Sequence, residues 1–248
     1  MPAFDYSTLP FEVRDDLAQA HRHYWHKLAT AGSWWSGAER VAIAQEVRNA
    51  LRCDYCVERK QSLSPYQLPG EHSHGHTLPA VAVDAIHRIV TDQGRITRDW
   101  VQQIQTRGLS EPHYVELAAV VVTVFSIDEF NRGLGLPPED LPRPIPGEPD
   151  HYLPGNTEST TGFVAMLPAK GRLGSRERGL WSPGRSANVL RALSLVPDSV
   201  RDWQSVADAQ YLPAERLIRF TAETGRSINR MQMEIVAGRV SSCNECFY

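Results

Sequence analysis

The sequence predicts an all-helical protein. Long amphipathic stretches with apolar residues at helical spacing dominate the 248 residues, and segments with the two-residue alternation of a strand are few. Helix start and stop signals flank several of these stretches, and a proline-rich segment separates them into two groups. The composition is that of a globular protein, with 42% hydrophobic and 22% charged residues.

The formal net charge is only −3, which gives no electrostatic attraction to nucleic acid or to an anionic membrane. No stretch approaches the ~20 apolar residues of a membrane-spanning helix, and the N-terminal residues lack the layout of a signal peptide. We therefore expect a cytoplasmic protein with neither nucleic acid nor membrane as a partner.

The first part of the chain predicts five helices, over residues 11–31, 36–51, 81–90, 97–105 and 114–130. Ser36 and Glu39 have the spacing of a capping box, so the second helix should begin there and continue toward two cysteines. Residues 64–79 are rich in Gly, Pro and His and predict a loop. The most apolar helix carries Glu116 and Asp128, which are either buried and paired or at an exposed edge.

Seven prolines fall within residues 137–154 and exclude a helix or a central strand, so this segment should be a semi-extended linker. It divides the chain into regions 1–136 and 155–248. After a poorly patterned stretch, helical periodicity returns over 187–195, 198–211, 214–221 and from 227 onward. A weak internal repeat, with Val13-Arg14-Asp15 echoed by Val200-Arg201-Asp202, suggests that the second region is an incomplete copy of the first.

Four cysteines form two C-x-x-C pairs, Cys53 with Cys56 and Cys243 with Cys246. On one helix each pair would share a face, and in a reducing compartment such a pair is more often catalytic or metal-binding than a structural disulfide. The thiolate is the reactive form of cysteine, and nearby cations lower a thiol pKa.

Three cations, Arg52, Arg59 and Lys60, can lie beside Cys56. We therefore expect Cys56 to attack an oxidant and Cys53 to resolve the product. Two alternative roles remain open for the cysteines. Cys53 and Cys56 could be small, buried, apolar core residues, or all four cysteines could form a zinc site as thiolates.

The run Ser36-Gly-Ala-Glu39-Arg40-Val41 and the run Cys53-Asp-Tyr-Cys56-Val-Glu-Arg-Lys60 resemble the core helix pair of alkylhydroperoxidase D and carboxymuconolactone decarboxylase-like proteins. Segments starting at Ala85, Gly108 and Tyr114 look like the helices that follow, so the resemblance spans about residues 10–140. It implies a helical bundle that forms homo-oligomers, without a cofactor or metal. It also implies reduction of hydroperoxides or disulfides, with a dithiol protein as reductant.

In that family, two residues relay the proton of the attacking thiol. They are a Glu twelve residues before the first Cys and a His four residues after the second Cys. Val41 and Lys60 occupy these positions here, and Lys60 then aids Cys56 only as a fixed charge. Glu46, seven residues before Cys53, is the candidate substitute for the family Glu.

The tail Ser242-Cys-Asn-Glu-Cys246-Phe-Tyr248 resembles the family motif more closely, with Glu234 twelve residues before Cys246. The next position would hold the attacking residue. Two explanations for the absence of that residue stay open. Either a selenocysteine codon is read as a stop, or a frameshift or truncation ends the sequence.

The sequence thus predicts a thiol-dependent peroxidase or disulfide oxidoreductase. The alternative is a non-catalytic helical protein that assembles with itself or a partner and keeps vestigial thiols. The loop Glu71-His72-Ser-His74-Gly-His76 is interpreted as solvated in preference to a weak metal site.

Overall fold

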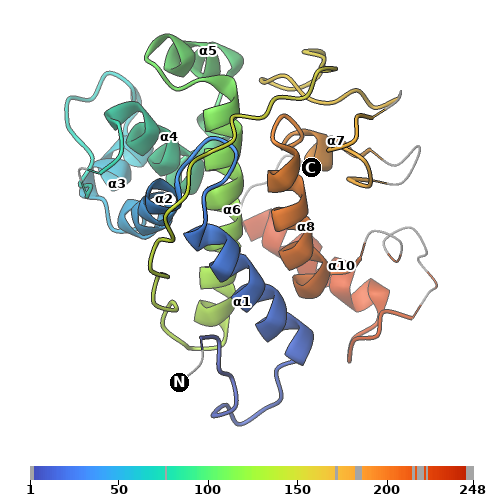
Figure 1. The fold of residues 1–248 in the computed structure, drawn as a ribbon. Coiled ribbons are helices and arrows are strands. Elements are labelled where there is room, and N and C mark those ends of the chain that lie inside the picture. Colours follow the sequence, from blue (N-terminus) through green and yellow to red (C-terminus); the bar gives the residue numbers. More distant parts are fainter. Residues whose placement is uncertain are drawn as a thin grey trace.

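The computed structural model describes residues 3–75, 77–170, 173–181, 186–213, 216, 221 and 223–243. Within these ranges the protein is all-α, as the sequence predicts (Figure 1). The one strand-like feature of the described ranges is an isolated antiparallel bridge between Glu158 and Met166. In the part of the chain that is described, no helix combines the length and the apolar character needed to cross a membrane.

The helices of the first region are α1 (Asp15–Ala29), α2 (Gly37–Ala50), α3 (Asp54–Gln61), α4 (Ala80–Thr91), the 3₁₀ helix η1 (Gln93–Arg95), α5 (Arg98–Thr106) and α6 (Glu111–Gly133). After the linker follow α7 (Asn188–Arg191), α8 (Pro197–Gln210) and α10 (Arg230–Cys243). The helix expected over 214–221 falls outside the described residues, apart from positions 216 and 221.

Helix α6 is the centre of the fold, because α2 and α4 pack on one side of it and α8 on another, with α1 bridging α2 and α8 (Figure 1). Its apolar side chains Leu117, Val124 and Ile127 are fully buried. Each such side chain stabilises the fold by about 1.5–3 kcal/mol relative to an exposed position. Two of its carboxylates are buried and paired, Glu116 with Arg40 and Asp128 with Arg48.

Helix α2 starts as predicted: the Ser36 hydroxyl accepts from the Glu39 amide, and the Glu39 carboxylate accepts from the Ser36 amide. The helix continues toward the thiols, as expected, and ends before it reaches them. Backbone bonds from Arg52 to Asn49 (3.0 Å) and from Cys53 to Ala50 (3.3 Å) tighten the chain into a turn that ends α2. A new helix, α3, begins directly after Cys53, which is its N-cap residue.

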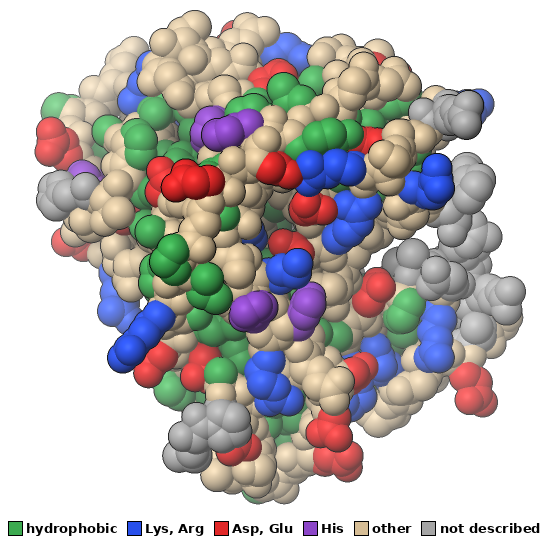
Figure 2. Space-filling view, viewed as in Figure 1, with side chains coloured by type: hydrophobic (Ala, Val, Ile, Leu, Met, Phe, Trp, Pro, Cys, Tyr) green, Lys and Arg blue, Asp and Glu red, His purple; other side chains and the backbone are tan. Residues whose placement is uncertain are grey.

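The proline-rich segment 137–154 is extended, without helix or strand. It runs along the α1–α2 junction, where the Ile145 amide donates to Ala29 and the His151 amide donates to Ser33. Residues on both sides of this segment share one hydrophobic cluster, which includes Val164 and Val206. Charged side chains of both signs are interspersed over the face seen in Figure 2.

Candidate functional site

The two thiols of the first C-x-x-C pair lie side by side in the interior. Cys53 precedes the first residue of α3, and Cys56 is in the first turn of that helix. They are 1% and 4% exposed, and neither forms a disulfide. Their sulfur atoms are within 4.8 Å of one another. The turn after α2 therefore brings both sulfurs into one buried place without a continuous helix.

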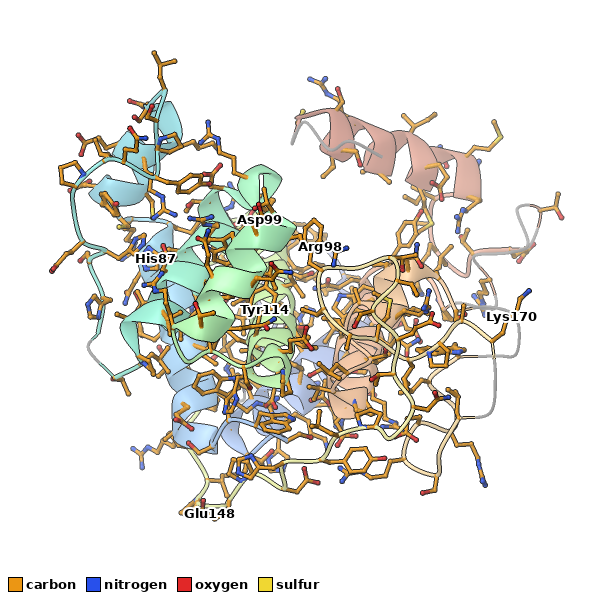
Figure 3. All side chains as sticks on the ribbon, turned by 90° about the horizontal axis from the view of Figure 1, so that it is seen from above. His87, Arg98, Asp99, Tyr114, Glu148 and Lys170 are labelled. Atoms are coloured by element: carbon orange, nitrogen blue, oxygen red, sulfur yellow. The ribbon has the colours of Figure 1, made fainter. Side chains whose placement is uncertain are left out.

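His87, on α4, links Cys56 to Glu46. Its Nδ1 atom is 3.1 Å from the Cys56 sulfur, and its Nε2 atom is 2.8 Å from Oε1 of Glu46. The imidazole has no exposed surface and lies among the packed helices (Figure 3). An ionised carboxylate can only accept, so Nε2 donates to Glu46 and Nδ1 of the neutral ring can accept from the thiol.

Glu46 is buried on α2, one turn before that helix ends. Burial by itself would raise the pKa of this carboxyl. Hydrogen bonds from His87, from the Gly75 amide (3.2 Å) and from Asn49 (3.2 Å) outweigh it and lower the pKa. Glu46 is therefore an ionised acceptor at neutral pH, and the candidate from the sequence does face the thiols through His87.

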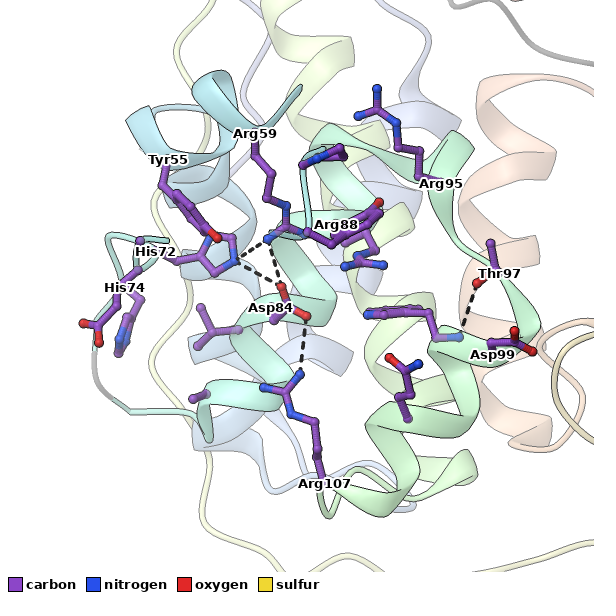
Figure 4. A pocket seen from close by; sticks show the side chains of 18 residues that line it. Tyr55, Arg59, His72, His74, Asp84, Arg88, Arg95, Thr97, Asp99 and Arg107 are labelled. Carbon is purple, nitrogen blue, oxygen red and sulfur yellow. Dashed lines mark hydrogen bonds and ion pairs between the residues drawn. The ribbon is translucent and has the colours of Figure 1, made fainter. Parts of the chain in front are cut away.

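A second imidazole reaches both sulfurs from the loop before α4. Nδ1 of His72 is 3.4 Å from the Cys56 sulfur and 3.8 Å from the Cys53 sulfur. Its Nε2 is 3.3 Å from Oδ1 of Asp84, which also pairs with Arg59 at 3.1 Å (Figure 4). Burial lowers the pKa of His72, so its ring is neutral at neutral pH.

The expectation that cations would ionise Cys56 was wrong. Burial raises the pKa of the Cys56 thiol well above its ordinary value, and the lowering effect of Arg59 is smaller. Arg52 and Lys60 project from the surface and are exposed. The resting thiol is therefore protonated, and its reactivity must depend on a base that takes the proton.

Two hollows flank the thiols. Cys56 lines one of about 550 Å³, whose other walls are mostly apolar: Ala50, Leu51, Val57, Lys60, Ile89, Val90, Thr91, Gln93, Val121, Val122 and Phe125. His72 lines the other, of about 790 Å³, which also holds Arg59, Arg88 and Arg107 (Figure 4). Cys56 is thus buried yet adjacent to a solvent-connected space.

Of the remaining residues predicted for the site, Lys60 is exposed and lines the apolar hollow beside Cys56, whereas the C-terminal residues lie elsewhere. Glu234, on α10, accepts from the Tyr211 hydroxyl and pairs with Arg230. Cys243 is an exposed free thiol, and Cys246 lies outside the described residues. The predicted site at the C-terminal pair therefore stays a prediction.

The two imidazoles were missed by sequence reasoning as parts of the site. His72 belongs to the loop that we interpreted as solvated, and His87 was noted only within an apolar helical segment. One signal was present for His87, because it follows the buried residues Ala85 and Ile86 on a helix whose buried face is otherwise largely apolar. A buried histidine in such a place requires polar partners.

No protein-family profile, no curated protein and no solved structure matches this chain.

Proposed function

We propose that the protein is a thiol-dependent oxidoreductase of the alkylhydroperoxidase D type, in which Cys56 attacks a hydroperoxide and Cys53 resolves the product. The observation that carries this proposal is the chain of contacts from Glu46 through His87 to Cys56, with Cys53 in reach of Cys56. A nucleophile, a base in contact with it and a carboxylate that orients the base form the usual arrangement for activating a weak nucleophile.

In this mechanism the protonated Cys56 thiol gives its proton to Nδ1 of His87 as the sulfur attacks the distal oxygen of a hydroperoxide. The O–O bond breaks, the alcohol leaves with a proton, and Cys56 becomes a sulfenic acid. The Cys53 sulfur then attacks the Cys56 sulfur, water leaves, and a Cys53–Cys56 disulfide forms. Glu46 stabilises the imidazolium that exists between these proton transfers.

A dithiol partner would restore the thiols by exchange with this disulfide. Its attack on either sulfur gives a mixed disulfide, and a second thiol of the partner then releases the reduced site. The apolar hollow beside Cys56 offers a route for the oxidant, and its walls favour an organic hydroperoxide over hydrogen peroxide.

The test is peroxide consumption with dithiothreitol, in a Cys243→Ser/Cys246→Ser background that retains only the internal pair. Cys56→Ser should abolish turnover. In the absence of dithiothreitol, which itself reduces a sulfenic acid, Cys53→Ser should allow one turnover and leave a sulfenic acid that a dimedone probe detects. Unchanged peroxide consumption by the Cys56→Ser protein would eliminate this function.

The alternative is a non-catalytic helical protein that assembles with a second copy of itself, its thiols being vestigial. One observation favours it: α10 exposes the apolar side chains Met231, Ile235, Val236 and Val240. Under this alternative, Cys56 resists oxidation by cumene hydroperoxide, and Ile235→Glu converts an oligomer to a monomer in size-exclusion chromatography.

A further inference from the structure

Four potential metal ligands converge beside the apolar hollow. Their ligand atoms all lie within 4.8 Å of one another: Cys53 Sγ, Cys56 Sγ, His72 Nδ1 and His87 Nδ1. They come from three separate places in the chain: the start of α3, the loop before α4, and α4 itself. The His72 side chain is 9% exposed and the other three residues are less exposed, so the cluster is a built interior feature.

The distances suit a tetrahedral ion. With Zn–S of about 2.3 Å and Zn–N of about 2.0–2.1 Å, a tetrahedral zinc site has sulfur–nitrogen edges of about 3.6 Å. The corresponding distances here are 3.1 Å from Cys56 to His87, 3.4 Å from Cys56 to His72 and 3.8 Å from Cys53 to His72. These three edges differ from the ideal length by 0.5 Å or less, and the other three are shorter than 4.8 Å.

Both imidazoles are already oriented for a metal. Each turns Nδ1 toward the sulfurs and has a carboxylate near Nε2. For His87 this is Glu46 at 2.8 Å, and for His72 it is Asp84 at 3.3 Å, where Arg59 Nη1 is equally close. A carboxylate on the far nitrogen fixes the tautomer that leaves the near nitrogen free to coordinate, an arrangement typical of metal-bound histidines. Arg59 in turn holds Asp84, which keeps this second contact in place.

The charge of the buried cluster also permits the exchange of protons for a metal. Two thiolates neutralise the charge of one divalent ion, so the bound site adds no net charge to the buried cluster. No carboxylate belongs to the set of four, and two thiolates with two imidazoles favour zinc over magnesium or calcium.

We propose that the reduced protein binds one Zn²⁺ ion through Cys53, Cys56, His72 and His87. The ion joins the start of α3 to the loop before α4 and to α4. Because the proposed thiol chemistry uses three of the same residues, zinc also controls it; this second statement rests on the proposed function. A bound ion occupies the Cys56 sulfur and the His87 nitrogen, which withholds both nucleophile and base.

Oxidation would then release the metal. The two zinc-bound thiolates lose two electrons and form the Cys53–Cys56 bond. The hydroperoxide takes these two electrons, together with two protons from the solvent, to give an alcohol and water, and Zn²⁺ leaves the site. Atoms and charge balance with the hydroperoxide as the only oxidant.

The test adds Co²⁺ to the reduced full-length protein under anaerobic conditions, in the Cys243→Ser/Cys246→Ser background. We expect one equivalent of cobalt with the visible bands of a tetrahedral ion and a near-ultraviolet sulfur-to-cobalt band, and Zn²⁺ should displace it. His72→Ala should weaken binding at least tenfold and change the visible bands, whereas the exposed His26→Ala should bind as the parent does. His72→Cys should retain the tetrahedral bands and strengthen the sulfur-to-cobalt band, because it adds a third thiolate.

Absence of tetrahedral cobalt bands in the folded, reduced protein would overturn the metal site, even if peroxide were consumed normally. Cobalt bands without peroxide turnover would support the site while eliminating the proposed function. If the protein consumes peroxide, a zinc-loaded sample should do so at least tenfold more slowly at first and should release zinc to a chromophoric chelator. An equal initial rate with zinc bound would overturn the regulatory part.

Discussion

Oε1 of Glu46 lies 2.8 Å from Nε2 of His87, a residue 41 positions further along the chain. This contact exists because α2 packs directly against α4. It sets the orientation of the imidazole whose other nitrogen faces Cys56, so one hydrogen bond orients the ring for both proposed roles, as a base and as a metal ligand.

Replacing Glu46 by Gln should lower kcat/KM for cumene hydroperoxide by about 10²-fold, since a positioned acid–base group contributes roughly 10²–10⁴. The amide cannot stabilise an imidazolium as a carboxylate does. Steady-state assays with dithiothreitol measure the effect. Glu58→Gln, an exposed position on α3, is the matched control and should leave kcat/KM unchanged. Equal loss in both variants would contradict the relay.

Replacing Val57 by Asp should reduce the preference for organic hydroperoxides. Val57 lines the hollow beside Cys56 and is 54% exposed. A charge there removes apolar contact worth about one kcal/mol, so kcat/KM for cumene hydroperoxide should fall about fivefold to tenfold relative to hydrogen peroxide. Val189→Asp, on α7 and equally solvent-facing, should keep the original ratio. An unchanged ratio in the Val57 variant would place the substrate elsewhere.

Zinc should raise the thermal stability of the reduced protein. An ion that binds only the folded state at about 100 times its dissociation constant adds about 2.7 kcal/mol to the free energy of unfolding. For a chain of this size, each kcal/mol raises the melting temperature by roughly 2–4 °C. Differential scanning fluorimetry with zinc, and then with excess chelator, measures the rise and its reversal. The Cys53→Ser/Cys56→Ser protein should show neither.

Glu116 should make the protein less stable as the pH rises toward neutrality. Burial raises the pKa of this carboxyl to about 7, despite the charge of Arg40. A folded-state pKa above the unfolded value means that Glu116 favours folding fully below about pH 4.5, and that this contribution is lost as the pH rises through 7.

The measurement is the free energy of unfolding in urea between pH 5 and pH 8 for the wild type and for Glu116→Gln. The difference between the two proteins should shift in favour of the variant by on the order of 2–3 kcal/mol over this interval. Glu129→Gln, at the other end of α6, is the control and should show no such shift. A pH-independent difference for Glu116→Gln would contradict a raised pKa.

Much of the local structure was predictable. The capping box at Ser36 and Glu39, the apolar length of α6 and the prolines of residues 137–154 depend on interactions within a few residues, so a linear pattern records them. The break between α2 and α3 was not predicted, because no Gly or Pro marks it. The break is made by backbone bonds from the Arg52 and Cys53 amides to Asn49 and Ala50, which no particular side chain in the sequence signals.

The sequence by itself determined the all-helical class, the thiol pair and the candidacy of Glu46, because helical periodicity and residue chemistry are local properties. Only the tertiary structure decided which groups meet the sulfurs. His72 and His87 arrive from a loop and from another helix, and their positions depend on the packing of α2, α3 and α4. Burial, which is a property of the whole fold, also reversed the expected direction of the Cys56 pKa.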